Sequence, residues 1–349
     1  MSNTGDIRSY TYDELCGLMR DIGEKPFRAG QIFDWLHAKG ASDISVMTNL
    51  SKELREKLSM EHDISHLRIV KKLVSDIDGT RKYLHALDDG NVIETVLLKY
   101  DYGNSICISS QVGCRMGCRF CASTAEGLVR DLTAGEMAGQ IYSVEEDTGE
   151  KISHVVVMGS GEPLDNYDNF TRFVDIITDP RGKGLGGRNI TASTCGIVPR
   201  IRQLADRKYA LTLALSLHAV TDEKRKQIMP VASAYPLDEV LDACRYYFDT
   251  TGRRITLEYS LISGFNDTLE DAVRLAETAS SLKAHVNLIP VNPIKERGYR
   301  ATGLQGIAQI KNLLEKNRIN VTIRREMGRD INGACGQLRR SFITGEENA

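Results

Sequence analysis

The stretch "CRMGCRFC", residues 114–121, places three cysteines within eight residues, with no fourth cysteine nearby. A structural zinc site has four ligands and usually takes them from paired C-x2-C knuckles, whereas this pattern is C-x3-C-x2-C. An iron–sulfur cubane that only carries electrons also has four protein ligands. Three thiolates would leave one metal position open for a cofactor or substrate. On spacing alone, zinc completed by a distant histidine or cysteine remains an alternative.

Composition sets the class of protein. The chain has 349 residues, of which 41% are hydrophobic and 26% charged, enough for one large domain or two unequal ones. A formal charge of -2 gives no overall signature of nucleic-acid binding, so any RNA-binding surface must be local. The polar amino terminus and the lack of long apolar stretches predict a cytoplasmic protein that does not bind membranes. Eight cysteines without a secretion signal favour metal binding or catalysis over a disulfide framework.

The hydrophobic pattern changes twice along the chain. Residues 10–62 have helical periodicity, and residues 67–100 read as three short strands separated by Asp-Gly turns, which predicts an antiparallel meander. After residue 104, apolar strands alternate with amphipathic helices. This alternation predicts an α/β fold with a parallel sheet, open or partly closed into a barrel, whose carboxyl strand ends hold the site.

A glycine-rich loop follows the next predicted strand after the cysteines. In "GSGEPLDN", residues 159–166, Gly161 lets backbone groups approach a ligand, and Glu162 can accept a hydrogen bond from a ligand ammonium group. The simpler interpretation is a tight strand-to-helix turn.

These segments together resemble the RlmN/Cfr family of radical S-adenosylmethionine (SAM) RNA methyltransferases, with the RlmN branch the better match. The resemblance runs from "FRAGQIFDWLH" through "VIETV", "CISSQVGC", "GEPLDNYDN", "SLHA", "VNLIPVNP" and "TIRREMG" to "ACGQLR". It implies a partial (βα)6-type barrel of parallel strands, a [4Fe-4S] cluster and SAM. The expected domains are a helical RNA-recognition module at 1–65, a linking β-meander at 66–100, the radical SAM core at 101–343 and a tail at 344–349.

The resemblance also assigns residues. It implies that the cluster ligands are Cys114, Cys118 and Cys121. The residues that it implies for SAM binding are Gly161, Glu162, Ser193, Ser216, Leu217, His218 and Asn292. For the serines, alternation on half-buried strands is the plain alternative, and for His218 a local hydrogen bond.

Three further residues have catalytic roles in the family. Cys335 matches the cysteine that one SAM methylates, and a radical from a second SAM then activates this methyl group for addition to adenine. Cys107 matches the cysteine that resolves the covalent RNA adduct through a transient disulfide, and Glu94 matches the proposed proton acceptor. Without the resemblance to the family, we would interpret Cys107 and Cys335 as buried thiols and Glu94 as a solvated carboxylate.

The expected reaction is methylation of carbon 2 of adenosine in 23S rRNA and in tRNA, by a monomer that receives electrons from flavodoxin or ferredoxin. One alternative is the Cfr-type reaction at carbon 8. Another is a non-catalytic RNA-binding protein with structural zinc. Candidate RNA contacts are the basic runs, including "DEKRKQ" at 222–227 and Arg324, Arg325 and Arg329, although such runs are usually solvated faces.

Overall fold

The computed structural model describes residues 5–291 and 298–331. Two of the predicted site residues, Asn292 and Cys335, lie outside the described residues, as does the predicted tail.

A ten-stranded sheet dominates the fold, in the order β14-β13-β12-β11-β10-β9-β6-β5-β4-β3. Its parallel part comprises β6 (Gly103–Ile108), β9 (His154–Val157), β10 (Ile190–Thr194), β11 (Thr212–Ser216), β12 (Thr256–Leu261), β13 (His285–Pro290) and β14 (Val321–Ile323). Every neighbouring pair in this part is parallel. Parallel strands need crossover connections, which here are helices.

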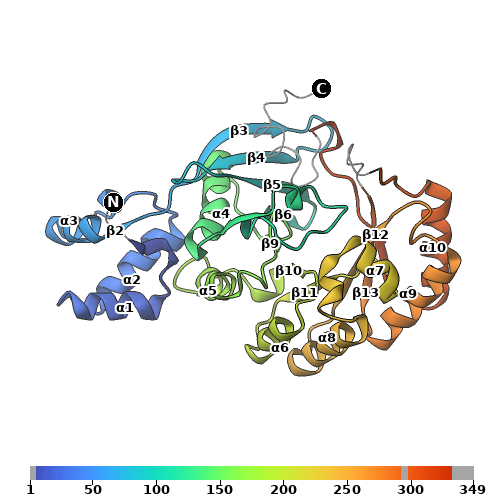
Figure 1. The fold of residues 1–349 in the computed structure, drawn as a ribbon. Helices are drawn as coiled ribbons and strands as arrows, with labels where there is room; N and C mark the ends of the chain where they lie inside the picture. Colours follow the sequence, from blue (N-terminus) through green and yellow to red (C-terminus); the bar gives the residue numbers. More distant parts are fainter. Residues whose placement is uncertain (1–4, 292–297, 332–349) are drawn as a thin grey trace.

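The crossover helices are α4 (Ala134–Thr148), α5 (Tyr167–Thr178), α6 (Val198–Asp206), α7 (Asp222–Ile228), α8 (Leu237–Thr251), α9 (Leu269–Ser281) and α10 (Leu304–Lys316). Helices α5, α6, α8, α9 and α10 follow one another along the outer side of the sheet (Figure 1). Local signals fix their ends: Thr133 and Thr268 form capping boxes, and Gly252 ends α8 in the left-handed conformation. In the described chain, six strand–helix units lead to β14, which confirms the predicted (βα)6-type partial barrel.

The predicted meander is β3 (Arg68–Val74), β4 (Arg81–Ala86) and β5 (Val92–Tyr100), all antiparallel. It does not form a separate sheet, because β5 pairs antiparallel with β6 and so extends the parallel sheet. Side chains on β5 therefore share a face with side chains on the first strand of the barrel.

The two faces of the sheet differ in polarity. On β10, Ile190 and Ala192 are buried, whereas Thr191 and Ser193 are partly exposed. Strand β13 has the same alternation, with Val286 and Leu288 buried. Because successive side chains on a strand point to opposite faces, one face packs apolar residues under the helices and the other has the polar ones. We call this second face the polar face.

The amino-terminal helices are α1 (Tyr12–Asp21), α2 (Phe27–Phe33) and α3 (Lys52–Glu61), with a π-helical turn at Asp34–Ala38 and a short parallel pair of β1 (Gly5–Asp6) and β2 (His62–Asp63). Short 3-10 helices cover Ile7–Ser9, Ile44–Val46, Ala122–Thr124, Gly187–Asn189, Pro230–Ser233 and Arg329–Ile331. Helices α1, α2 and α3 lie at the end of the molecule opposite α10 (Figure 1). The domain boundary at residue 65 stays a prediction.

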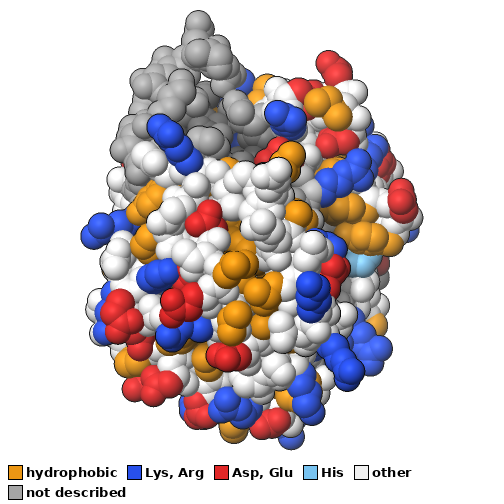
Figure 2. Space-filling view, turned by 90° about the vertical axis from the view of Figure 1, so that its right-hand side faces the viewer, with side chains coloured by type: hydrophobic (Ala, Val, Ile, Leu, Met, Phe, Trp, Pro, Cys, Tyr) orange, Lys and Arg blue, Asp and Glu red, His pale blue; other side chains and the backbone are white. Residues whose placement is uncertain are grey.

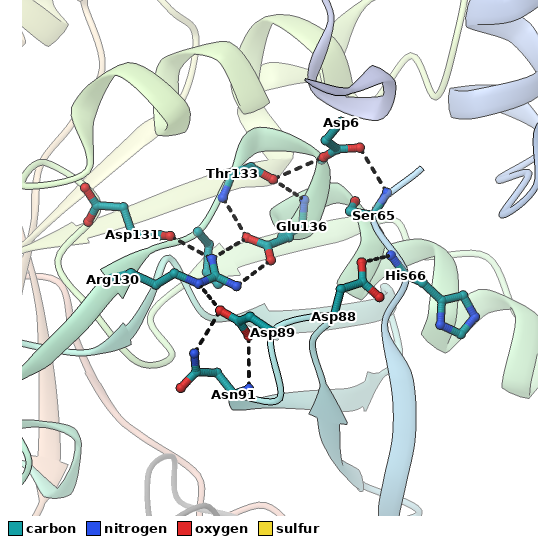
Figure 3. Close-up of polar contacts among 12 residues, drawn as sticks. Asp6, Ser65, His66, Asp88, Asp89, Asn91, Arg130, Asp131, Thr133 and Glu136 are labelled. Atoms are coloured by element: carbon teal, nitrogen blue, oxygen red, sulfur yellow. Dashed lines mark hydrogen bonds and ion pairs between the residues drawn. The ribbon is translucent and has the colours of Figure 1, made fainter. Parts of the chain in front are cut away.

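A polar network attaches this helical module to the barrel (Figure 3). Asp6 accepts hydrogen bonds from the Ser65 backbone at 3.0 Å and from Thr133 Oγ1 at 3.2 Å. Arg130 binds both carboxylate oxygens of Glu136, at 2.8 and 2.9 Å, and also forms an ion pair with Asp89 in the β4–β5 turn. Bidentate arginine–carboxylate pairs fix geometry as well as charge. The network thus joins the module, the meander and the start of α4.

The contact between the module and α4 predicts a pH-dependent stability. His37 is fully buried, and its Nδ1 lies 3.0 Å from the Tyr142 hydroxyl. Burial lowers the pKa of His37 from 6.5 to about 3. The unfolded chain therefore takes up a proton that the folded chain rejects, so stability falls as the pH drops below 6.5. In urea denaturation, His37→Phe should reduce the stability lost between pH 7 and 5 by roughly 1–2 kcal/mol.

His66→Asn, which replaces an exposed histidine, is the control variant. If the free energy of unfolding of His37→Phe falls as steeply with decreasing pH as that of the unaltered protein, the His37 ring is not the cause of the pH dependence.

Candidate functional site

The three cysteines lie on a loop enclosed by a small hairpin. After β6 the chain forms β7 (Gln111–Gly113), and it returns as β8 (Leu128–Asp131), antiparallel to β7. The Cys114 backbone N–H donates to the Gly127 carbonyl at 2.9 Å and closes the neck of the loop. Thr124 Oγ1 lies 2.9 Å from the Cys118 carbonyl and 3.0 Å from the Cys121 carbonyl. The backbone that carries the thiols is therefore held at both ends.

Helix α7 and the turn after it support the loop from one side. The Arg119 backbone N–H donates to the Ile228 carbonyl at 2.9 Å, and Cys118 packs in an apolar cluster with Met229. Gly117 has a φ of +70° and adjoins Pro230, where a Cβ would come within 3.3 Å of the proline ring. The loop conformation therefore depends on glycine at this position.

Burial favours the protonated form of the thiols on this loop. Burial raises the pKa of Cys114 to about 12 and raises that of Cys118 further, and the neighbouring thiols add to both effects. Metal binding reverses this preference, since the thiolate is the ligand form. In residues 5–291 and 298–331, no three His, Cys, Asp or Glu side chains are gathered as a ready metal site. The donor set, three neighbouring thiols on one loop, nevertheless fits a cluster that takes three protein ligands.

The glycine-rich loop after β9 is bonded to the start of the cysteine loop. The Ser110 and Gln111 backbone N–H groups both donate to the Ser160 carbonyl, at 2.8 and 3.1 Å. Gly161 has a φ of +107°, and a Cβ there would lie 2.7 Å from the Gln111 nitrogen. Only glycine tolerates both the conformation and the close approach.

Glu162 links the loops after β9 and β10. It is buried, and its Oε1 accepts from the Leu164 backbone at 3.0 Å while its Oε2 accepts from the Cys195 backbone at 2.7 Å. Burial raises the pKa of Glu162 despite these bonds. The Thr194 and Cys195 side chains also interact with this carboxylate, which has about four acceptor sites, so a ligand ammonium group would share or replace one of these partners.

The structure brings together the predicted SAM residues of β10 and β11. Ser193 Oγ and Ser216 Oγ lie 3.2 Å apart on the polar face. Leu217 is fully buried, and its backbone N–H donates to the Glu258 carbonyl at 3.0 Å. His218, with a φ of +54°, accepts from the Ser260 backbone through Nδ1 at 3.0 Å. This bond is the local role that the sequence left as an alternative, and it leaves Nε2 as the protonated nitrogen.

Cys107 and Glu94 share the polar face with these serines. Strand register pairs Val96 with Cys107, and Glu94 lies two residues before Val96, so its side chain is on the same face as Cys107. Cys107 in turn pairs with Val156 of β9, and Val156 pairs with Thr191, two residues before Ser193. One polar surface therefore runs from β5 to β11.

Sequence reasoning missed Lys82. It is fully buried on β4, opposite Val96, and its Nζ lies 3.2 Å from Glu94 Oε2. The only signal in the sequence is that Lys82 occupies an inward position of the strand "RKYLHA". This position can be recognised only once the register of the strand is known. Glu94 is thus a buried, paired carboxylate and not the solvated one that the sequence alone favours.

Arg225 corrects one reading of the basic runs. The sequence "DEKRKQ" marks it as a candidate RNA contact, but its side chain is fully buried and donates to the Cys195 carbonyl in the loop after β10. Helical periodicity explains the difference, because Arg225 and Ile228 lie three residues apart on the inner side of α7 and Lys226 is exposed.

A three-cysteine loop after the first strand of a partial parallel barrel defines a radical SAM protein, and residues 108–276 match the family model of the radical SAM superfamily. Residues 6–64 match the model of the ribosomal RNA large subunit methyltransferase N-terminal domain. The solved radical SAM methyltransferase of Sphaerobacter thermophilus superposes with a TM-score of 0.90 at 39% identity, over 95% of this chain and 98% of that one.

Two curated relatives define the family more closely. The probable dual-specificity RNA methyltransferase RlmN of Lachnospira eligens is 56% identical over 338 residues, which is 97% of each chain. That of Clostridioides difficile is 51% identical over 96% of this chain and 98% of its own. The chain therefore belongs to the RlmN family of radical SAM RNA methyltransferases. It is an enzyme that uses SAM and a [4Fe-4S] cluster, which excludes the structural-zinc alternative.

Among the described residues, no helix has the length and apolar character needed to cross a membrane.

Gly161 provides a test of the glycine-rich loop. Gly161→Ala should weaken SAM binding at least tenfold and destabilise the protein by about 1–3 kcal/mol, because the added Cβ meets the Gln111 backbone in a disallowed conformation. Equilibrium dialysis and urea denaturation measure the two effects. Gly252→Ala is the control, since it adds a Cβ at a φ of +66° with no heavy atom within 4 Å and should not change SAM binding. Equal SAM affinity in both variants would contradict the assignment.

Proposed function

We propose that the protein methylates carbon 2 of adenosine in 23S rRNA and in tRNA, in the cytoplasm, as a monomer supplied with electrons by flavodoxin or ferredoxin. The observation that carries the proposal is the shared polar face, where Cys107 and Glu94 lie in register with Ser193 and Ser216. The names of the curated relatives, which are RNA methyltransferases, support the substrate class.

The proposed cluster ligands are Cys114, Cys118 and Cys121, and the glycine-rich loop with Glu162 holds the amino group of SAM. When bound, the cluster supplies the electron that cleaves SAM and so gives the radical chemistry needed at an unactivated ring carbon. An adenine ring carbon whose only substituent is a hydrogen atom cannot be methylated by simple polar attack on SAM.

The chain's own residues then have three tasks. Cys335 holds the methyl carbon on its sulfur. Glu94 accepts the proton that leaves the adenine ring carbon, and Lys82, 3.2 Å away, orients the Glu94 carboxylate. Cys107 forms an S–S bond with Cys335 as the bond between the Cys335 sulfur and the methylene carbon breaks. The released carbon gains a proton to become the methyl group, and the unpaired electron of the adduct would return to the cluster. A disulfide that forms and is reduced again in a reducing compartment is typical of catalysis.

The RNA must reach the polar face from its open edge. Arg324, Arg325 and Arg329 are exposed at and beyond the end of β14, and we assign them to phosphate contacts. The face formed by α9 and α10 is less suited to RNA, since basic and acidic side chains are mixed on it around apolar ones (Figure 2). The target adenine has to leave its stack to reach buried groups such as Glu94.

The product identifies the reaction. We expect anaerobically reconstituted protein, incubated with SAM, a reductant and unmodified ribosomal RNA, to form 2-methyladenosine, as measured by chromatography and mass spectrometry of nucleosides. Cys335→Ala should form none, and Cys244→Ala, which changes a buried core thiol, should form the normal amount. Formation of 8-methyladenosine would assign the Cfr-type reaction instead. SAM cleavage without methyladenosine on either RNA would refute the proposed substrate.

The step that releases the RNA from its covalent bond to the protein can be tested separately. Cys107→Ala and Glu94→Gln should both accumulate RNA bound to protein, because one lacks the resolving thiol and the other the proton acceptor. A denaturing gel with labelled RNA shows the adduct as a slow band, which should be absent from Cys335→Ala and from the unaltered protein. If either variant turns over normally without this band, the role assigned to that residue is wrong.

A further inference from the structure

Arg225 is a buried cation whose charge the fold does not neutralise. Among the described residues it is the largest fully buried side chain, and it lies on the inner side of α7. Its Nη2 donates to the Cys195 carbonyl at 2.5 Å, but Nε and Nη1 have no hydrogen-bond partner among the described residues. No ion pair joins it to a carboxylate in that part of the chain; Asp222, on the same helix, acts on it only through space.

This arrangement is costly in the protein as described. An arginine stays charged in proteins, so burying it without a counter-charge costs free energy that one neutral carbonyl does not offset. Folded proteins tolerate such a group when a ligand supplies the missing charge. The two open nitrogens of Arg225 therefore point to an anion.

The position of α7 identifies the anion. In their thiolate forms, Cys195 and then Cys118 would stabilise the Arg225 cation, whereas burial holds both thiols protonated in the absence of metal. The same helix supports the cysteine loop, since the Ile228 carbonyl accepts from Arg119 and Met229 packs against Cys118. Cys195 follows β10, where its backbone N–H holds Glu162. Helix α7 thus places a fixed positive charge behind the loop that we assign to the cluster.

We propose that Arg225 is the counter-charge of the cluster, a positioning residue that stabilises its reduced form through Cys118. A cluster held by three thiolates is anionic, and the added electron makes it more so. A buried guanidinium favours the more negative state, because cluster potentials depend on net local charge, hydrogen bonds and burial. The inference rests on the proposed ligation by Cys114, Cys118 and Cys121.

The direct test is the midpoint potential of the reconstituted cluster, measured by redox titration with electron paramagnetic resonance and without added SAM. Arg225→Met should retain a full iron content and shift the potential to a more negative value. Arg225→Lys, which keeps the charge, should shift it less. Lys226→Met, the matched control, removes an exposed charge from the same helix and should leave the potential unchanged.

A stability measurement separates this role from a structural one. Without the cluster, Arg225→Met should be at least as stable to heat as the unaltered protein, because the variant no longer buries an unneutralised charge. A large loss of stability in the cluster-free variant would make Arg225 part of the fold and overturn the inference.

Two other results would also overturn it. One is an unchanged potential in Arg225→Met. The other is an unchanged potential with weakened SAM binding in equilibrium dialysis, which would assign the guanidinium to the carboxylate of SAM. If the proposed cluster ligands are wrong, Cys118→Ala will bind the normal amount of iron. This result is independent of Arg225→Met, so it separates an error in the ligands from an error in the role of Arg225.

Discussion

The register of one continuous sheet is the constraint on which the site depends. Because β5 pairs with β6 and β6 with β9, side chains far apart in sequence fall on one face: Lys82, Cys107 and Ser193 occupy rows set by backbone hydrogen bonds. A shift of one residue in any pairing would turn that strand's polar side chains toward the helices. The antiparallel meander is therefore part of the site and not only a linker.

The loops at the carboxyl ends of the strands are joined to one another by backbone groups. Ser160 accepts from the loop after β6, and Glu162 accepts from the loop after β10. Substitution at Gly161 would disturb several loops at once. A radical reaction needs such a rigid enclosure, because small displacements of a reactive group cost much of the rate.

Much of this could be predicted from the sequence. The alternation of strands and helices and the meander follow from periodicity and local motifs, and these are confirmed. The ligand roles of the three cysteines stay a prediction. Contacts between side chains that lie far apart in the sequence could not be predicted from periodicity or local motifs. Lys82 is buried against Glu94 because of strand register, and Arg225 is buried against the loop after β10 because of the rotation of α7. A charged residue in a sequence is expected to be solvated by default.

We place the reaction chamber at the carboxyl edge of the polar face. Crystals of anaerobically reconstituted protein with SAM, measured at the iron absorption edge, test it most directly. We expect one iron cluster bound by Cys114, Cys118 and Cys121, with SAM extending along Ser193 and Ser216. Iron elsewhere, or SAM bound away from those serines, would contradict it.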